Sequence, residues 1–557
     1  MGIKLSKLPQ LSDEDLSNRE TLLWQLLRER EECIQELKDE IARLTGEKGK
    51  PKIKPSRLEP EKKAQGQQEE KEEEDAPQNK QGTKKRPGSE KRQKTANLII
   101  HETKVIQPTE LIPPDAEFRG YQDYTVQELI IEAHNTRYRL AIWKTPTGKY
   151  LKGKLPEKVR ALGHFGVMLR SYLLYQYHHC HVTQPKLLEQ MREWDIDISS
   201  GQLNRILVEN KEAYHAEKQD LLRVGLAVSS YINTDDTSAR HQGVNSYCTQ
   251  IGNEWFAWFE TTSRKNRMNF LELLRGERTD YVLSSEALTY MAEHKLPQSS
   301  WLPLSWSLDR VFKDKEEWLS YLKGLGIEKK SHVKTATEAA LLGAVLASGV
   351  SPDLGIISDG AGQFRWFVHG LCWVHAERLI NKLIPLTEAQ RKAVETVQDQ
   401  IWSLYQDLKS YKHLTPDQQQ QQKARLEASF DQIFTANTSL ETLNQVLRRL
   451  LRRKAELLKV LDRPELPLHN NVSEQDIREF VTKRKISGST RSEEGRRCRD
   501  TFASLKKTCR QLGVSFWEYL SDRVGGQNLI PTLGKLIAQK AKVSLGELAQ
   551  TVSLSLA

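Results

Sequence analysis

Three acidic residues lie where a carboxylate can do chemistry. Asp235 follows the apolar, β-rich run 226–234, Asp359 follows the apolar run 354–357 in a glycine-rich turn, and Glu474 lies in a segment with helical spacing. Two aspartates at neighbouring strand ends and a glutamate from a helix behind the sheet can hold two divalent ions about 3.5–4 Å apart, as in-line phosphoryl transfer requires. Oxygen ligands favour Mg²⁺ or Mn²⁺. The pattern predicts a two-metal site for phosphoryl transfer.

Two of these carboxylates also have a purely structural explanation. Asp359, followed by Gly360, could do no more than make an Asx turn. Glu474 could cap its helix or pair with Arg478 one turn later. The order strand, acidic turn, strand and helix around Asp359 is nevertheless how an α/β sheet places a metal-binding carboxylate at its rim.

A basic stretch follows Glu474. Residues 478–510 contain eleven Lys or Arg against four Asp or Glu, the densest basic stretch in any segment that also looks folded. Such cations would hold a phosphate backbone against the acidic site. The formal net charge of +10 suits a polyanionic partner without requiring one. The candidate DNA contacts are Arg478, Lys483, Arg484 and Lys485.

Cys372 and His375 form a C-x-x-H pair, which can be half of a zinc site. No second pair lies nearby, so we favour a role in packing and in positioning the following segment. The six cysteines are scattered, which indicates neither a disulfide framework nor a cysteine-rich zinc ribbon. We therefore expect no zinc.

The elements that must position the carboxylates read as a mixed sheet with helices. Residues 245–251 and 254–262 alternate like a hairpin around Gly252-Asn253. Residues 337–347 form an alanine-rich helix, whereas 263–333 are hard to place. Thr415-Pro416 predicts the start of a helix. Asn470, Asn471 and Ser473 mark the start of the helix that carries Glu474. The fold class is α/β.

The N-terminal third differs in character. Leucine and isoleucine at spacings of three, four or seven over 12–44 predict a coiled coil, with a helix packed on its own domain as the alternative. The charged run 48–94 cannot offset the entropy of ordering and is expected to be a disordered linker. Segments 125–133 and 137–143 predict two paired strands, and Thr147-Gly148 predicts a further turn. Helices at 184–194 and 201–208 are compatible with a helix-turn-helix.

These patterns divide the chain into eight regions. They are a coiled-coil helix (1–47), a disordered charged linker (48–96), a small β module without zinc cysteines (97–157), a helical, helix-turn-helix-like region (158–222), the first part of a catalytic core (223–384), a helical insertion (385–462), the second part of the core with Glu474 and the basic stretch (463–525), and a helical tail (526–557).

Four separated motifs resemble the insertion-sequence-66 family of bacterial transposases, over roughly 97–523. The motifs are Asp235-Asp236-Thr237, Ser358-Asp359-Gly360, the run from Cys372 to Arg378 (CWVHAER), and Asn470-Asn471-Val472-Ser473-Glu474 followed by Arg478 and Arg484-Lys485. Their order is far more specific than any one of them.

The resemblance implies an RNase H-like catalytic domain, split by a helical insertion before the glutamate. It implies DNA strand cleavage and joining at transposon ends, with Asp235, Asp359 and Glu474 as the catalytic, metal-binding residues and two Mg²⁺ or Mn²⁺ ions as cofactors. Family members usually have Asp-Glu-Thr at the first motif, where this chain has Asp236. Many carry a cysteine zinc ribbon, whereas 97–155 contain no cysteine, so zinc is not expected there either.

Two other functions remain open on the sequence alone: a non-catalytic DNA-binding protein derived from a transposase, and an RNase H-like nuclease that cuts without joining. The expected partners are double-stranded DNA, further copies of the chain and small companion proteins of the same element. No apolar run reaches the roughly 20 residues of a membrane span, and no signal-peptide core is present. We expect a cytoplasmic, nucleoid-associated protein without a membrane partner.

Overall fold

A computed structural model of the chain describes residues 99–109, 113, 115–385 and 387–542. The expected coiled coil, the whole of the expected linker and the end of the C-terminal tail lie outside the described residues. The described chain forms two compact units, one of residues up to 164 together with 184–203, and a larger one of 165–183 together with all residues from 204 onward. Each unit is considered by itself.

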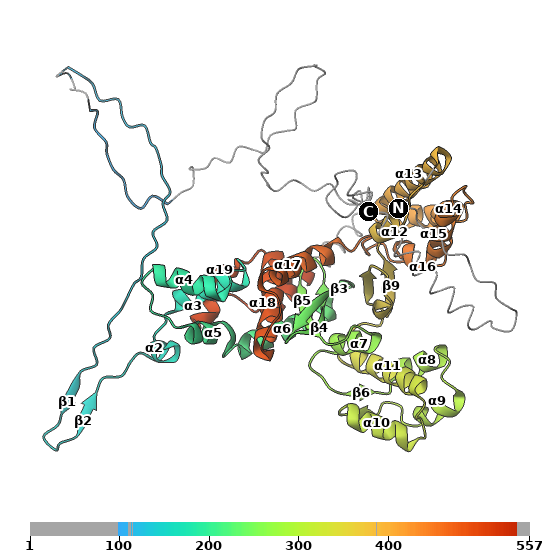
Figure 1. Ribbon diagram of the computed structural model, residues 1–557, viewed down its shortest axis with the longest axis horizontal. Coiled ribbons are helices and arrows are strands. Elements are labelled where there is room, and N and C mark those ends of the chain that lie inside the picture. Colours follow the sequence, from blue (N-terminus) through green and yellow to red (C-terminus); the bar gives the residue numbers. More distant parts are fainter. Residues whose placement is uncertain (1–98, 110–112, 114, 386, 543–557) are drawn as a thin grey trace, which may run out of the picture. The chain divides into compact units, whose positions relative to one another are not determined.

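A five-stranded mixed sheet lies in the larger unit (Figure 1). Its strand order is β5-β4-β3-β8-β9; the first three strands are antiparallel, and β8 and β9 run parallel to β3. All four residues of β8 are buried, as expected for a parallel strand covered on both faces. The strands are β3 (Tyr231–His241), β4 (Val244–Gly252), β5 (Ala257–Thr262), β8 (Gly355–Ser358) and β9 (Val368–Leu371).

The first strand is shifted from its predicted position. Helix α6 (Glu212–Val228) occupies the start of the predicted strand 226–234, and β3 begins only at Tyr231. The strand then continues to His241, because its second half pairs with β4 up to the turn between them. Asp235 therefore lies inside a strand, and the prediction that it ends one is wrong.

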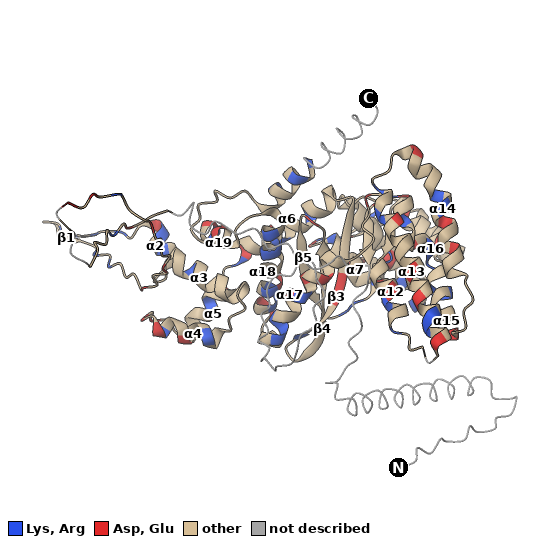
Figure 2. Ribbon diagram, turned by 90° about the horizontal axis from the view of Figure 1, so that it is seen from above, with Lys and Arg blue, Asp and Glu red and all other residues tan. Residues whose placement is uncertain are grey.

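Two long helices pack on this sheet. Helix α17 (Asn471–Ser487) contacts β3 and β4, and α18 (Glu493–Leu512) contacts β5. In the ribbon of Figure 2, Lys and Arg positions (blue) lie along both helices, while acidic positions (red) lie on β3. The basic stretch predicted after Glu474 thus belongs to two folded helices beside the sheet.

Side chains of α18 bond the outer edge of β5. The backbone N–H groups of three alternate strand residues donate to three helix side chains four residues apart: Thr261 to Asp500 Oδ2 at 2.8 Å, Phe259 to Ser504 Oγ at 2.9 Å, and Ala257 to Thr508 Oγ1 at 3.1 Å. An edge strand otherwise leaves such donors unpaired. The edge of the sheet at β5 is therefore closed by a helix.

The segment that the sequence left unplaced is a helical lobe between β5 and β8. Its helix α11 packs on α7, α8 and β6, and the approach is so close that a Cβ on Gly343 would lie 2.2 Å from the carbonyl oxygen of Val282. The elements are α7 (Arg267–Arg275), β6 (Tyr281–Val282), α8 (Ser285–Glu293), α9 (Gln298–Ser305), β7 (Val311–Phe312), α10 (Lys315–Gly324) and α11 (Lys330–Ala347).

The helices predicted between the second aspartate and the glutamate are present. They share one apolar core that includes Trp373, Leu408 and Phe430. Thr415 caps α14 through a reciprocal bond pair with Gln418, where the sequence predicted a helix start. The elements are η1 (Gly362–Phe364), α12 (Trp373–Asn381), α13 (Glu388–Tyr411), α14 (Pro416–Phe434), α15 (Glu441–Leu451), α16 (Lys454–Leu457) and η2 (Lys459–Leu461).

The smaller unit contains one short hairpin, β1 (Ile142–Lys144) with β2 (Tyr150–Lys152). The strand predicted at 125–133 is wrong, since those residues have no regular structure, and the strand predicted at 137–143 is β1, which starts five residues later. The predicted turn at Thr147-Gly148 does join the two strands. The unit also holds α2 (Glu157–Leu162) and α4 (Gln184–Glu193).

The remaining helices are α3 (Val167–His178) and α19 (Phe516–Val524) in the larger unit and α5 (Ser200–Val208), which spans the boundary between the units. Helices α4 and α5 match the predicted helical pair within one residue at each end, while its role as a helix-turn-helix stays a prediction. Among the described residues, no helix combines the length and the apolar character that crossing a membrane needs.

Candidate active site

Asp235 lies on the face of β3 that is turned toward α17. Side chains alternate along a strand, so Asp235 shares its face with Asn233 and Thr237. Asn233 Nδ2 donates to Asn470 Oδ1 at 2.9 Å, next to the start of α17, and Arg484 near the end of α17 donates to Thr237 Oγ1 at 3.3 Å. Asp235 is therefore between two anchor points of the helix that carries Glu474.

Asp359 directly follows β8, the parallel neighbour of β3. Asn233 pairs with Ile357, and Asp235 and Asp359 each come two residues later. Because neighbouring strands are about 4.8 Å apart, this register places the two aspartates side by side. Asp359 Oδ1 also accepts the N–H of Ala361 at 2.9 Å. The Asx turn and the position beside Asp235 thus occur together.

Glu474 lies in the first turn of α17. The buried Asn470 just before the helix donates its amide to the carbonyl oxygen of Thr234 at 2.9 Å. Gln250 of β4 donates to Asp476 Oδ2 at 3.1 Å and also bonds Ser473. These bonds fix the start of α17 against β3 and β4, on both sides of Glu474 in the sequence.

The pKa of Asp235 is affected by the charges of neighbouring acidic residues. Its pKa is raised to about 7, mainly because burial disfavours the charged carboxylate. A hydrogen bond from the N–H of Asp236 opposes the rise. The charges of Asp359 and Glu474 add to the rise, as does that of Asp236. Asp359 and Glu474 are therefore close enough to Asp235 for their charges to act on its carboxylate.

Asp236 lies on the opposite face of β3. Its Oδ1 accepts Thr249 Oγ1 at 2.6 Å and its Oδ2 accepts Gln363 Nε2 at 2.8 Å, so each carboxylate oxygen has a donor. Burial raises its pKa, while these two bonds and the nearby Lys265 lower it. Among the described residues, Asp235 accepts a hydrogen bond only from the N–H of Asp236, so it is the better metal ligand of the two.

Two arginines and a histidine lie around Glu474, and of these the sequence predicted only Arg478 as its partner. His375 Nδ1 lies 3.6 Å from its Oε1, and Arg378 and Arg478 lie 3.5 and 3.7 Å from its Oε2. Burial lowers the pKa of His375, while the charge of Glu474 opposes that shift. The run from Cys372 to Arg378 thus lies beside Glu474. His375 and Arg378 are three residues apart and share one helix face, and this spacing is the signal in the sequence that could have predicted their common partner.

Cys372, His375 and Glu474 bring ligand atoms within 4.8 Å of one another and could hold a metal ion. Cys372 is fully buried, and its Sγ accepts the N–H of Asn470 at 3.2 Å. Burial is the main cause that raises its thiol pKa to about 11, so the group is protonated at neutral pH. A soft metal would have to displace that proton and compete with the two arginines for Glu474.

A second polar group supports the Asp359 turn. Ser358 Oγ bonds His369 Nε2 at 2.9 Å and accepts the N–H of Gly360 at 3.2 Å, and His369 Nδ1 lies 3.1 Å from Glu456. Arg453 pairs with the same Glu456. A Cβ on Gly360 would lie 3.2 Å from both terminal nitrogens of Arg453. An arginine from the insertion therefore lies beside Asp359.

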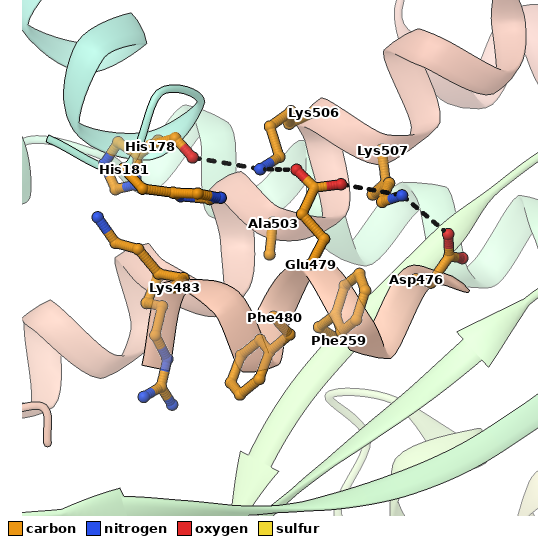
Figure 3. A pocket seen from close by; sticks show the side chains of 11 residues that line it. His178, His181, Phe259, Asp476, Glu479, Phe480, Lys483, Ala503, Lys506 and Lys507 are labelled. Carbon is orange, nitrogen blue, oxygen red and sulfur yellow. Dashed lines mark hydrogen bonds and ion pairs between the residues drawn. The ribbon is translucent and has the colours of Figure 1, made fainter. Parts of the chain in front are cut away.

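Of the four residues predicted to contact DNA, Lys483 is buried, and the prediction for it is wrong. Its side chain is 7% exposed and lines a pocket together with His178 and His181 (Figure 3). Lys483 Nζ donates to the carbonyl oxygen of Tyr177 at 2.6 Å. Burial, with Lys506 and Arg499 as smaller causes, lowers its pKa to about 7. Asp476, Phe480 and Lys483 form a buried stripe at helical spacing, which explains why this lysine turns inward.

Arg478, Arg484 and Lys485 differ in how easily a phosphate group could reach their side chains. Arg484 bonds Ser238 Oγ at 2.8 Å and the Ser238 carbonyl oxygen, which ties α17 to β3. Arg478 is 58% exposed and pairs with Glu474. Lys485 is exposed. Of the four predicted contacts, Lys485 and the exposed part of Arg478 are thus the ones that a phosphate can reach.

Comparisons with known proteins agree with the motifs. A family model described as "Transposase IS66 family" matches residues 361–497, a stretch that contains Cys372, His375 and Glu474. An uncharacterized protein, y4jO, of Sinorhizobium fredii (strain NBRC 101917 / NGR234) is 46% identical over 325 residues, which cover 58% of this chain and all of that protein. No solved structure matches the chain. The resemblance stated from the sequence is confirmed: the chain belongs to the IS66 family of transposases.

Proposed function

We propose that this protein is a DNA transposase of the DDE type, which binds the ends of an insertion sequence and catalyses metal-dependent strand cleavage and strand transfer. Asp235, Asp359 and Glu474 are the catalytic residues. Double-stranded DNA, as transposon end and as target, is the partner. Further copies of the chain and small companion proteins belong to the same proposal, as does action at the nucleoid in the cytoplasm.

One observation carries the proposal. Burial and the charges of Asp359 and Glu474 raise the pKa of Asp235 to about 7, which supports the proposal that these three carboxylates act together. A carboxylate held this far from its usual pKa is typical of functional sites. The sheet carrying two of these residues, interrupted by helices before the third, also supports an RNase H-like core.

The donor set fits Mg²⁺ or Mn²⁺. Asp235, Asp359 and Glu474 offer only carboxylate oxygens, the ligands that these hard cations prefer. When bound, two such ions would activate a water or 3′-hydroxyl and stabilise the leaving oxygen. Without divalent ions, no bound cation offsets the negative charges of Asp359 and Glu474 that act on Asp235. Binding such ions would offset this repulsion.

The protein's own groups prepare the site. Asn470 and Gln250 fix the first turn of α17, so that Glu474 keeps its place relative to β3. Arg378 pairs with the Glu474 carboxylate and balances its charge, while His375 lies beside the Oε1 atom of the same carboxylate. Ser358, with His369 behind it, shapes the turn that presents Asp359. Glu474 and Asp359 thus have separate supports.

The test is cleavage and joining of labelled transposon-end DNA with Mg²⁺ or Mn²⁺. Glu474→Gln keeps the size of the side chain but removes its charge, so both reactions should fall by orders of magnitude while DNA binding survives. Glu494→Gln is the matched control, because Glu494 also lies in the first turn of a helix but is exposed. Cutting by Glu474→Gln at the rate of the control would overturn the proposal; cutting without joining by the wild type would identify a nuclease.

A further inference from the structure

The hairpin of the smaller unit is a two-stranded ribbon with every strand residue exposed. Ile142, Trp143 and Lys144 pair with Lys152, Leu151 and Tyr150. The ladder continues at both ends, from Gly153 N–H to the Ala141 carbonyl oxygen at 2.8 Å and from Thr145 N–H to the Lys149 carbonyl oxygen at 2.8 Å. We call residues 137–154 the basic ribbon.

Charge is sharply concentrated in the basic ribbon. Its eighteen residues include six Lys or Arg and no Asp or Glu, whereas 99–133 contain seven Asp or Glu and two Lys or Arg. Within the described part of the chain, none of the six cations forms an ion pair with an acidic side chain. Lys144 Nζ lies 5.7 Å from the centre of the Tyr150 ring. The ribbon's positive charge is therefore left uncompensated.

Large apolar side chains are exposed on both faces of the basic ribbon, with Trp143 and Leu151 on one face and Ile142 and Tyr150 on the other. Ile142 is 62% exposed, Trp143 72%, Tyr150 65% and Leu151 51%. A two-stranded hairpin is marginally stable by itself in water, and apolar groups exposed together on a ribbon mark a contact surface. A partner of the basic ribbon must therefore bind cationic and flat apolar side chains at the same time.

We propose that the basic ribbon binds duplex DNA, as a surface separate from the catalytic helices. The inference rests on the proposed function, since it names a surface by which the transposase would hold its substrate. A two-stranded ribbon fits the major groove of B-DNA, where its side chains reach base edges and its lysines reach phosphates. Charge complementarity selects this partner, because six cations without an acid would repel a second basic ribbon.

The experiment uses the full chain without divalent ions, so that catalysis does not enter. The ribbon variant Lys144→Gln, Lys149→Gln, Lys152→Gln removes three exposed cations. The control variant Lys315→Gln, Lys323→Gln, Lys329→Gln removes three exposed cations from the helical lobe and changes the net charge equally. Binding of a fluorescently labelled duplex is measured by anisotropy over a range of salt concentrations, with circular dichroism to verify folding.

Every lysine that no longer neutralises a phosphate should reduce the slope of log K against log salt by about 0.9, so the ribbon variant should differ by about 2.7. A fourfold rise in salt would then cost the wild type about 40-fold more affinity than the ribbon variant. The control variant should keep the wild-type slope.

Equal slopes for wild type and ribbon variant would overturn the proposal. So would a ribbon variant whose only change is its sedimentation coefficient, since the ribbon would then bind another copy of the chain. A variant with unchanged DNA binding and lower thermal stability would instead show that the acidic segment 99–133 covers the ribbon. Failure of the wild type to cleave DNA would overturn the proposed function while leaving the binding result standing.

Discussion

Asn470 donates its side-chain amide to the carbonyl oxygen of Thr234 at 2.9 Å, so the residue four before Glu474 is bonded to the residue just before Asp235. The same side chain accepts Asn233 Nδ2, also at 2.9 Å, and is fully buried. One asparagine therefore sets the position of a helix relative to a strand at the point where both deliver a carboxylate.

Replacing Asn470 with leucine should reduce both stability and cleavage. The buried Thr234 carbonyl and Asn233 amide would be left without these partners, at a cost of about 1–3 kcal/mol each. Urea unfolding measures the change in the free energy of unfolding, and cleavage at saturating Mg²⁺ measures the displacement of Glu474. Asn471→Leu, one residue later in the partly exposed first turn of α17, is the control. Equal behaviour of the two variants would contradict the anchoring role.

The raised pKa of Asp235 predicts an unusual pH dependence of stability. Between about pH 4 and pH 7 the folded protein keeps a proton on Asp235 that the unfolded chain releases, so this group's contribution to the free energy of unfolding falls as pH rises through 7. The effect is on the order of a few kcal/mol without divalent ions. Thermal unfolding at pH 5 and pH 8 should show the difference, and Asp235→Asn should remove this part of it. Mg²⁺ should stabilise the protein more at pH 8, because it binds the deprotonated form.

Lys483 and Lys485 offer a matched pair two residues apart on α17. Lys485→Met should weaken DNA binding and reduce the salt slope by about 0.9, because the variant has one exposed cation fewer to neutralise a phosphate. Lys483→Met should leave the slope unchanged, since the buried amine bonds Tyr177. Anisotropy titrations at several salt concentrations compare the two. A reduced slope for Lys483→Met would show that α17 rearranges when DNA binds.

Cys372 should not hold zinc. Its buried thiol has a pKa of about 11 and accepts the Asn470 N–H, so the purified protein should contain less than one zinc per chain by elemental analysis. Cys372→Ser should keep Mg²⁺-dependent cleavage within a few-fold of the wild type. Stoichiometric zinc that is absent from the serine variant would instead assign Cys372, His375 and Glu474 to a metal site.

The sequence predicts the structure best where an element depends mainly on residues close to it in the chain. The apolar run before Asp359, the Asn470-Asn471 helix start and the Thr415 cap all appear where expected, because each depends on neighbouring residues. The position of Asp235 within β3 depends on pairing with β4, and the burial of Lys483 depends on packing against α3 and α18. Interactions of that kind join residues far apart in the chain and leave little trace in a local pattern.

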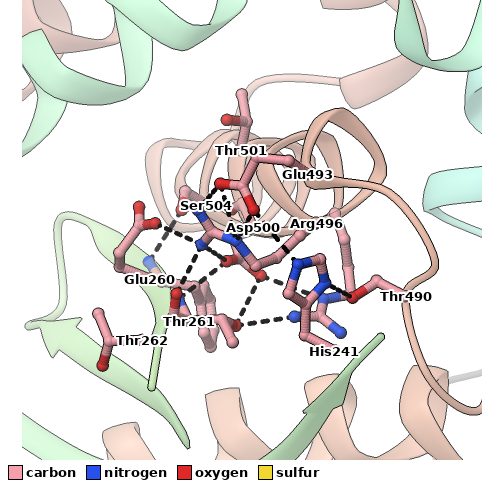
Figure 4. A network of polar contacts seen from close by, with 12 residues as sticks. His241, Glu260, Thr261, Thr262, Thr490, Glu493, Arg496, Asp500, Thr501 and Ser504 are labelled. Carbon is pink, nitrogen blue, oxygen red and sulfur yellow. Dashed lines mark hydrogen bonds and ion pairs between the residues drawn. The ribbon is translucent and has the colours of Figure 1, made fainter. Parts of the chain in front are cut away.

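The bonds between side chains of α18 and the backbone of β5 restrict where residues can be inserted or deleted in this part of the chain (Figure 4). Three side chains at spacing four match three N–H groups at spacing two. A single residue inserted between Asp500 and Thr508 would rotate the following part of the helix by about 100°, carrying at least one of the three acceptors off the strand. Related chains should therefore tolerate substitutions among short hydroxyl and acidic residues at these positions, while insertions and deletions should be confined to the ends of α18.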